Sequence, residues 1–594
     1  RSGIDTYTDE REDFYPTLSS GSNNGGRFTK ETITRTQFNT DFILKKNFVL
    51  NENIDGSALV GMNMNDRVLD DHGGTIRSFT NPDAPSNLTN ASGGNSSLFD
   101  YMEQERTRGY YTSIDLAFYD QLFVNLTGRM DQLSTLPEDD NTIIYPAVNV
   151  AWQFSKLIKE NKILSFGKLR VGYGQVGRGP SPYSLQRTFF APTADNTGWG
   201  EGWGPGLNPG ADLFGGGFAF SSVATNPELK AEIKTEFEIG TDLRFLKDRF
   251  YVNFTYYQNE VKDLLIQVDV PGSSGALSKF ENAATLENKG IEIEIGGLVM
   301  EKGDFTWNAY ANYTRNRNEV TDMSGVESIL LSGFSGTSSR AVLGQPLGTL
   351  WGGKWARDAS GAQVLDAFGF PTVAAENGVI GDPNPDFRMG IGSDFSYKKW
   401  TLGILFDMSI GGDMWNGTKG ALTYFGRTDE TVVETVLSAD QANNLGVYST
   451  TGGVRGTTVA DNFAHLQNSD GTYTVRGQIE NFGGGDVFLD ESYYWSGPGS
   501  GFTGPDEQFI EDASWSRLRE VSLSYDLTSD KLKEVAKIQA AKITFTGRNL
   551  LLFTDYTGND PDQNLNGSGN NGFGLDYFQN PSTRTYQFTL NLTF

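Results

Sequence analysis

Oxygen-bearing side chains recur at every second position near the C-terminal end of the sequence, at Asp560, Asp562, Asn564 and Asn566. Hard oxygen ligands at this spacing begin like a calcium-binding loop. Leu565 stands where the EF-hand loop has glycine, and no Glu follows at the twelfth position. An extracellular turn rich in Asp and Asn explains the same run. The pattern favours that turn and leaves Ca²⁺ as the alternative, with no other cofactor expected.

Tryptophan lies in three glycine-rich stretches, which read GWGEGWGPG, LWGGKWARD and GGDMWNG. The residues concerned are Trp199, Trp203, Trp351, Trp355 and Trp415. Aromatic rings beside glycine can stack on sugar faces or peptide side chains, because glycine lets the backbone approach a ligand. The same rings can pack the loops together, contact a protein partner or join an interfacial aromatic girdle. Both interpretations stay open, and the structural one is favoured.

Composition argues against several function classes. The chain has no Cys, which removes disulfides, thiolate metal sites and cysteine nucleophiles. Its two histidines, His72 and His465, are far apart in sequence, so a His-based catalytic or metal site is not expected. No nucleophile elbow, P-loop or zinc motif occurs, and no enzyme is predicted. A formal charge of −26, from 74 acidic and 48 basic residues, argues against nucleic acid as a partner.

The final ten residues, TYQFTLNLTF, show most clearly which elements position these side chains. The segment alternates strictly, which predicts a strand with one apolar and one polar face. The apolar face holds Tyr586, Phe588, Leu590, Leu592 and Phe594. In an outer-membrane β-barrel this face meets lipid, and the last strand closes the barrel as part of its assembly. A core strand of a β-sandwich is the alternative for this segment alone.

Amphipathic hairpins of the same kind recur along the chain. One joins the alternating strand that ends at Tyr119 to the strand that begins at Leu122 through the two-residue turn Asp120-Gln121. Between such hairpins run connections of about 50, 60 and 100 residues, far longer than compact soluble domains usually hold. Short turns alternating with long loops indicate an all-β transmembrane antiparallel barrel with periplasmic turns and extracellular loops, and we expect about 16 strands. No run of about 18 apolar residues is present, so no transmembrane helix is expected.

Several phrases of the sequence resemble the SusC-like TonB-dependent transporters of the starch-utilisation type found in Bacteroidetes. They include NPELKAEIKTEFEIGTDLRF, ENKGIEIEI, GQPLGTLWGGKW and GDPNPDFRMGIGSDFSYKKWTLGILF. They continue with LTGRMDQLSTLPEDDN, EDASWSRLREVSLSYDL, GRNLLLFTDYTGNDPD and the terminal RTYQFTLNLTF. These phrases occur in family order and cover most of the chain.

The resemblance implies a barrel of about 22 strands in the bacterial outer membrane. It implies import of large nutrients, either oligosaccharides or peptides, with energy relayed by TonB and with a SusD-like lipoprotein over the extracellular mouth. We expect residues 1–594 to be the barrel domain, with the plug, the TonB box and about six first strands lying outside this sequence. A passive porin and a secreted β-rich glycan-binding protein are the alternatives. The long loops 177–229, 322–387 and 411–511 are predicted to carry most of the lipoprotein contact.

Overall fold

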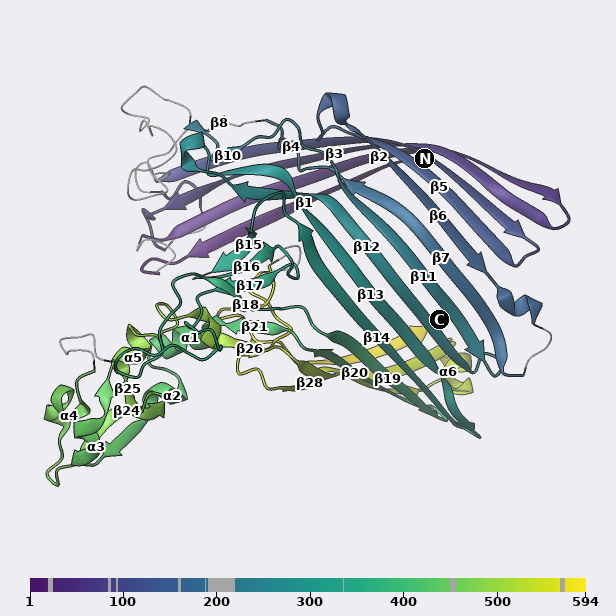
Figure 1. Ribbon diagram of the computed structural model, residues 1–594. Coiled ribbons are helices and arrows are strands. Elements are labelled where there is room, and N and C mark those ends of the chain that lie inside the picture. The colour runs from purple at the N-terminus through teal and green to yellow at the C-terminus, as the bar shows by residue number, and fades with distance from the viewer. Residues whose placement is uncertain are drawn as a thin grey trace. The chain divides into compact units, whose positions relative to one another are not determined.

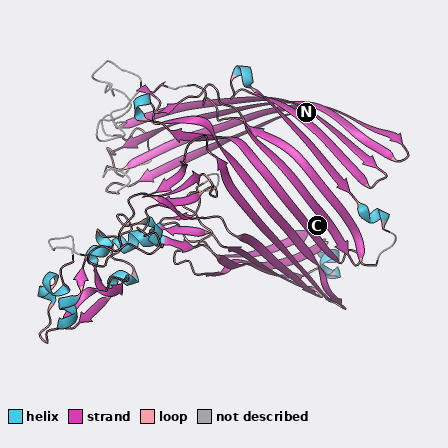
Figure 2. Cartoon of the chain, in the orientation of Figure 1, coloured by secondary structure: helices cyan, strands magenta, loops and turns pink. Residues whose placement is uncertain are grey.

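The computed structural model describes residues 1–19, 25–83, 87–91, 95–158, 162–186, 189–190, 219–334, 336–448, 456–566 and 572–594. Strands dominate it, and the described helices are short (Figure 1, Figure 2). Seventeen strands belong to one hydrogen-bonded sheet, and all but the two-residue β10 (Val223–Ala224) are long. The expectation of about 16 barrel strands is therefore confirmed.

The long strands are β1 (Ser2–Tyr15), β2 (Arg27–Asn51), β3 (Ile54–Arg77), β4 (Ser96–Phe118), β5 (Leu122–Leu133), β6 (Thr142–Trp152), β7 (Leu164–Arg178), β11 (Glu232–Phe245), β12 (Phe250–Asp269), β13 (Ser278–Lys302), β14 (Phe305–Asp322), β19 (Phe387–Tyr397), β20 (Trp400–Ile410), β27 (Trp515–Asp526), β28 (Ala540–Thr554) and β30 (Thr585–Thr593). The short strands are β8 (Phe189–Phe190), β9 (Ala219–Phe220), β15 (Ser328–Phe334), β16 (Thr337–Val342), β17 (Thr349–Gly352), β18 (Gly378–Gly381), β21 (Asp413–Asn416), β22 (Glu434–Leu437), β23 (Gly446–Val447), β24 (Tyr473–Asn481), β25 (Asp486–Asp490), β26 (Ile510–Asp512) and β29 (Leu575–Asp576). The helices are α1 (Gly417–Tyr424), α2 (Asp429–Val432), α3 (Ala439–Asn444), α4 (Val459–Asn462), α5 (Glu491–Trp495) and α6 (Asp530–Val535), with 3₁₀ turns η2 (Glu138–Asp140), η3 (Phe154–Leu157), η5 (Gly272–Ser274), η6 (Ala464–Leu466) and η7 (Asp506–Phe509).

The chain forms two compact units. The first holds Arg1–Lys156, Leu169–Ile239 and Asn259–Thr285, and the second holds Leu157–Lys168, Gly240–Gln258 and Leu286–Phe594. In the first unit β1 to β6 pair in sequence order, each strand antiparallel to the next. In the second unit β14, β19, β20, β27, β28 and β30 pair in the same way.

Tight turns set the register of these hairpins. In the β19–β20 hairpin Tyr397 pairs with Trp400, and only Lys398 and Lys399 separate them. Lys398 has a φ of 54°, the left-handed conformation that two-residue hairpin turns require. Longer connections, such as residues 411–514, follow at the opposite ends of the strands. The predicted alternation of short turns and long loops is confirmed.

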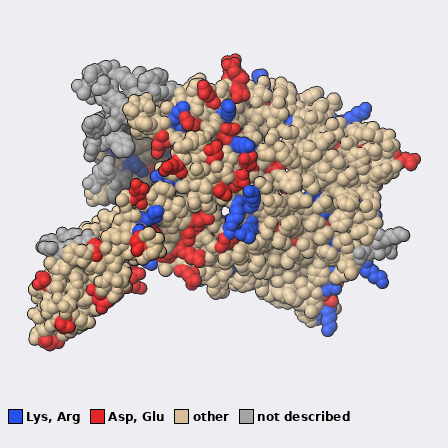
Figure 3. Space-filling view, in the orientation of Figure 1, with Lys and Arg blue, Asp and Glu red and all other residues tan. Residues whose placement is uncertain are grey.

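One face of the second unit's sheet carries a continuous row of large apolar side chains across six paired strands. The row consists of Trp307, Phe395, Leu402, Leu523, Phe545 and Phe588. The neighbouring row on the opposite face consists of Asp394, Gly403, Ser522, Thr546 and Gln587. Phe588 is 71% exposed, so the residues that the structure describes leave most of its side chain uncovered. Figure 3 shows a broad band over the strands in which charged side chains are few. Such a band is the surface that lipid covers in a membrane barrel.

Glycines on the sheet make room for tyrosine rings on neighbouring strands. The ring of Tyr310 on β14 lies across Gly392 on β19, where a Cβ would overlap it. Tyr111 lies in the same way across Gly61. These glycines remove the Cβ from crowded positions, and the neighbouring rings cover the backbone that they expose.

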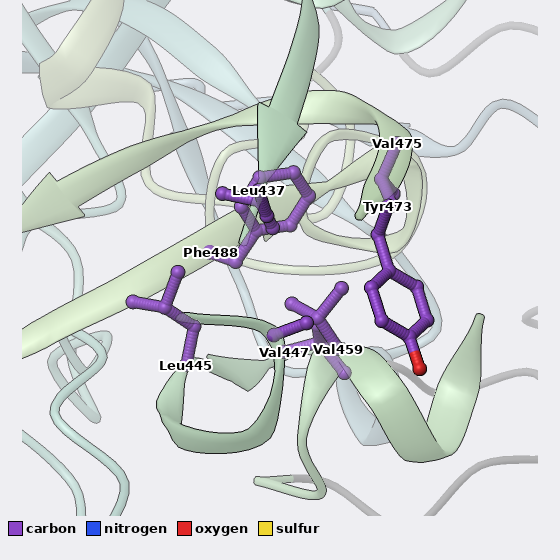
Figure 4. Close-up of a cluster of buried hydrophobic side chains, with 8 residues drawn as sticks. Leu437, Leu445, Val447, Val459, Tyr473, Val475 and Phe488 are labelled. Atoms are coloured by element: carbon purple, nitrogen blue, oxygen red, sulfur yellow. The ribbon is translucent and has the colours of Figure 1, made fainter. Parts of the chain in front are cut away.

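The long loops of the second unit are folded rather than irregular. Strands β15 to β18 form a small antiparallel sheet, and β21, β26 and β29 form a mixed one, in which β21 pairs antiparallel with β26 and parallel with β29. Between β20 and β27, helices α2 to α5 and strands β22 to β25 make a separate module (Figure 1). The core of this loop module is a cluster of buried side chains (Figure 4), namely Leu437, Ala442, Leu445, Val447, Val459, Tyr473, Val475 and Phe488. Ser438 and Gln441 form a capping box that starts α3.

Candidate functional site

Three side chains alternate along the first half of β27 on the polar face of the sheet: Trp515, Arg517 and Arg519. A bulge makes room for Arg519, because Leu405 on β20 pairs with Glu520 while the next residue, Phe406, pairs with Leu518. Both guanidinium groups lie beside the Trp515 ring, at 5.0 Å for Arg517 and 5.4 Å for Arg519. The indole therefore stabilises two cations that point the same way.

The two arginines bind the connection between β28 and β30. Arg517 Nη2 donates to Asp560 Oδ1 at 2.6 Å, and the two side chains are 3% and 1% exposed. Arg519 donates from Nη2 to Asp407 Oδ2 at 2.8 Å and contacts Asp562 Oδ2 at 3.3 Å. Because one charged pair is buried and hydrogen-bonded, it fixes this connection to the barrel wall.

A cavity of about 430 Å³ lies next to this network. The polar lining includes Arg388, Asp413, Asp562 and amide side chains, and the aromatic lining consists of Phe387, Trp515 and Phe573. The amides belong to Asn316, Asn384 and Asn564. Burial raises the pKa of Asp413, which also accepts a hydrogen bond from the Asp382 backbone N–H at 2.8 Å. A pocket with aromatic walls and several donors and acceptors suits a polar organic ligand.

The structure places the four predicted oxygen ligands in one connection but gives them different partners. Asp560 and Asp562 face the arginines. Asn564 accepts from the backbone N–H of Gly574 at 2.6 Å, and Asn566 donates to Ser332 Oγ at 2.7 Å. Among the residues that the structure describes, no group of three or more His, Cys, Asp or Glu side chains is arranged to hold a metal ion. Calcium binding stays a prediction. The contacts hold this Asp- and Asn-rich connection in place.

The predicted tryptophan positions differ in their surroundings. Trp415 is 2% exposed and packs with Leu350, Phe509 and Leu575, so its burial favours the packing role. Trp351 is partly exposed on β17, where Arg340 lies over its ring at 5.6 Å. Trp355 is partly exposed, and its backbone N–H donates to Glu507 at 2.9 Å. Trp199 and Trp203 lie outside the described residues.

Sequence reasoning missed the residues at the centre of this site. Arg517, Arg519 and Trp515 occur in the quoted phrase SWSRLRE, where large and charged side chains alternate. The two-residue period is the local signal that could have placed them together on one face of a strand. Their partners Asp407 and Asp560 are far away in sequence, and no local pattern joins them.

None of the described helices has both the length and the apolar character needed to span a bilayer.

Comparisons with known proteins agree with the fold. The family model described as TonB dependent receptor-like, beta-barrel matches residues 3–451. TonB-dependent receptor P3 of Formosa agariphila is 24% identical over 525 residues, covering 83% of this chain and 46% of that protein. TonB-dependent receptor SusC of Bacteroides thetaiotaomicron is 25% identical over 230 residues, covering 38% of this chain and 22% of that one. The chain thus spans about half the length of the first of these relatives.

Among solved structures, the RagAB peptide transporter aligns with a TM-score of 0.70 at 20% identity. The alignment covers 100% of this chain and 59% of that one, and it supports the fold. Together with the sequence similarity to SusC, it confirms the predicted resemblance to SusC-like proteins. The chain belongs to the TonB-dependent receptor-like β-barrel family, whose barrels lie in the bacterial outer membrane.

Proposed function

We propose that the protein to which this chain belongs imports large polar nutrients across the outer membrane, with energy relayed by TonB. The family match over residues 3–451 carries this proposal. All of residues 1–594 are assigned to the barrel domain. A relative named for TonB dependence and a barrel wall with one apolar and one polar face both support import through the lumen.

The cavity beside Trp515 supports a substrate that combines apolar faces with many hydrogen-bonding groups. Its lining offers aromatic rings, amides, one guanidinium group and two carboxylates. Oligosaccharides and peptides both have this chemistry, and both remain the proposed substrate classes. The proposed role of this site is binding without catalysis, which the match to a receptor family supports.

A SusD-like surface lipoprotein is the proposed partner. The folded loops 322–387 and 411–511 support this part, because they present exposed apolar side chains: Phe334 and Phe368 in the first loop, and Val432 and Val436 in the second. Aromatic residues are enriched in protein interfaces. Loop 177–229 is included as a contact region, although most of it lies outside the described residues.

Uptake measurements test the import proposal. Labelled neutral oligosaccharides and labelled peptides are offered to cells that carry the intact gene, lack it, or lack TonB. Loss of the same uptake in both deletion strains is expected. Uptake that needs the gene but persists without TonB would identify a porin, and uptake unaffected by loss of the gene would refute the proposal.

Co-purification tests the partner. Each of the three loops is shortened in turn in the intact protein, and the mild-detergent extract is examined for an associated lipoprotein. The expected result is retention by the intact protein and loss from at least one shortened form. Absence of a lipoprotein from the intact protein, or full retention by all three shortened forms, would contradict the partnership.

A further inference from the structure

An aromatic patch lies where the loop module meets helix α1. It is made of Tyr424, Phe425, Trp495 and Phe502, which come from two distant segments of the chain. Tyr424 stacks on Trp495 with ring centroids 4.3 Å apart and an angle of 20° between the ring planes. The Phe502 ring meets Tyr424 edge-on at 4.8 Å, and that of Phe425 does so at 5.1 Å. These contacts hold the rings in fixed orientations.

The patch is open to solvent. Phe425 is 58% exposed, Trp495 is 48% exposed and Phe502 is 40% exposed. It lies among the loops and not on the strand face that lipid covers. Grouped aromatic rings left exposed in this way indicate a binding surface, because burying apolar area is worth roughly 25 cal/mol per Å².

A small polar pocket adjoins the rings. Its volume is about 140 Å³, and Tyr424 and Trp495 share the lining with Arg476, Asp490 and Glu491. Two backbone carbonyls hold the Arg476 guanidinium: Nε donates to Thr431 at 2.6 Å and Nη2 to Gly426 at 3.1 Å. Asp490 is 97% buried, and its carboxylate accepts from Ser492 Oγ at 2.8 Å. The polar side chains are therefore positioned by the module itself.

We infer that this surface binds a sugar ring at the end of a neutral oligosaccharide. A pyranose has an apolar C–H face that stacks on an aromatic ring and an edge of hydroxyls that both donate and accept hydrogen bonds. The pocket is well below the roughly 300 Å³ at which drug-sized pockets begin, so it holds one small ring. It combines one cation with two acids, which favours a neutral ligand over an anion. This contact lies outside the cavity beside Trp515 and captures the ligand before it reaches the lumen.

The test uses the intact receptor purified in detergent and labelled for an array of neutral plant, algal and microbial oligosaccharides. The variant Trp495→Ala removes the exposed stacking ring, and Trp495→Phe keeps a ring there. Phe368→Ala is the matched control, because Phe368 is a loop aromatic that is 47% exposed and lies outside the patch. The expected result is a tenfold or greater loss of oligosaccharide binding for Trp495→Ala. Trp495→Phe should bind within about threefold of wild type and Phe368→Ala like wild type.

Two results would overturn the inference. One is an array on which no neutral oligosaccharide binds the wild-type receptor. The other is a Trp495→Ala receptor that binds oligosaccharide like wild type. If that variant also loses a co-purifying lipoprotein, the patch is a protein interface. The import proposal is tested separately, by measuring TonB-dependent uptake in cells. Failure of the sugar site therefore leaves uptake intact, whereas failure of import leaves array binding intact.

Discussion

Arg517 on β27 and Asp560 on the β28–β30 connection form a buried ion pair, with Nη2 2.6 Å from Oδ1. Arg517 Nε and Asp560 Oδ2 have no hydrogen-bond partner among the described residues. The pair therefore makes one short charged hydrogen bond, while one further polar atom of each side chain lacks a hydrogen bond within the described residues. It ties a loop to a strand that is more than forty positions away in sequence.

Breaking this pair should destabilise the protein strongly. Asp560→Ala removes the hydrogen-bonded carboxylate from a buried guanidinium and leaves it the longer 3.9 Å contact with Asp562. Breaking a buried pair in this way typically costs about 3–5 kcal/mol. Unfolding in urea, followed in detergent by heat-modified gel mobility, measures the change. The double variant Arg517→Met with Asp560→Leu removes both charges and should lose less stability than Asp560→Ala alone. Equal losses in the two variants would show that packing, and not the unpaired charge, sets the cost.

Filling a glycine position under a tyrosine ring should also destabilise the sheet. In Gly392→Val the new side chain overlaps Tyr310, so the ring must move, and overpacking of this kind costs about 1–3 kcal/mol. Gly128→Ala is the control, since the nearest atom to its Cβ would be Thr112 Cγ2 at 3.7 Å. Urea midpoints of both variants are compared with wild type. An unchanged midpoint for Gly392→Val would contradict the role of the ring.

The apolar face of the last strand is predicted to be essential for membrane insertion. Leu592→Asp places a charge among side chains that face lipid, and transfer of a charge into hydrocarbon is unfavourable. Asn591→Asp places the same charge one residue earlier, on the opposite face. Surface yield of the two variants, measured by protease accessibility on whole cells, should fall for Leu592→Asp and stay near wild type for Asn591→Asp. Normal yield of Leu592→Asp would reverse the assignment of faces.

The loop module should be stabilised by neutralising a buried acid. Burial raises the pKa of Asp490. An acid with a raised folded pKa contributes its full stability below its unfolded pKa, about 3.9, and that contribution is lost as pH rises through the folded pKa. Asp490→Asn should therefore protect the amides of β24 and β25 from hydrogen exchange better than wild type at pH 7. At pH 3 the two proteins should exchange alike.

The control for this experiment is Asp486→Asn, which changes an exposed acid on the same strand. Each variant is compared with wild type at the same pH, because intrinsic exchange rates vary with pH. If Asp490→Asn gained less protection from exchange over wild type at pH 7 than at pH 3, the predicted direction of the pH effect would be wrong.

The sequence alone determined the strands and which side of each faces outward. A period of two is a local property of the chain, and it placed Phe588 and Leu592 on the apolar face without any tertiary contact. The short turn before Leu122 predicted a hairpin for the same local reason, and the structure pairs the two strands that it joins. The family resemblance came from phrases of this repetitive framework.

Only the tertiary structure decided which contacts the loop residues make and which of them are buried. The oxygen-rich run at Asp560 suggested a metal loop, but Arg517 and Arg519 arrive from β27 and engage its two acids. Trp415 reads like an exposed aromatic beside glycines, yet Leu350 and Leu575 bury it. The patch at Trp495 exists because α1 and α5 bring rings from two segments together. Such pairings join positions that are distant in sequence, and their energy depends on burial and charge partners that a local pattern does not contain.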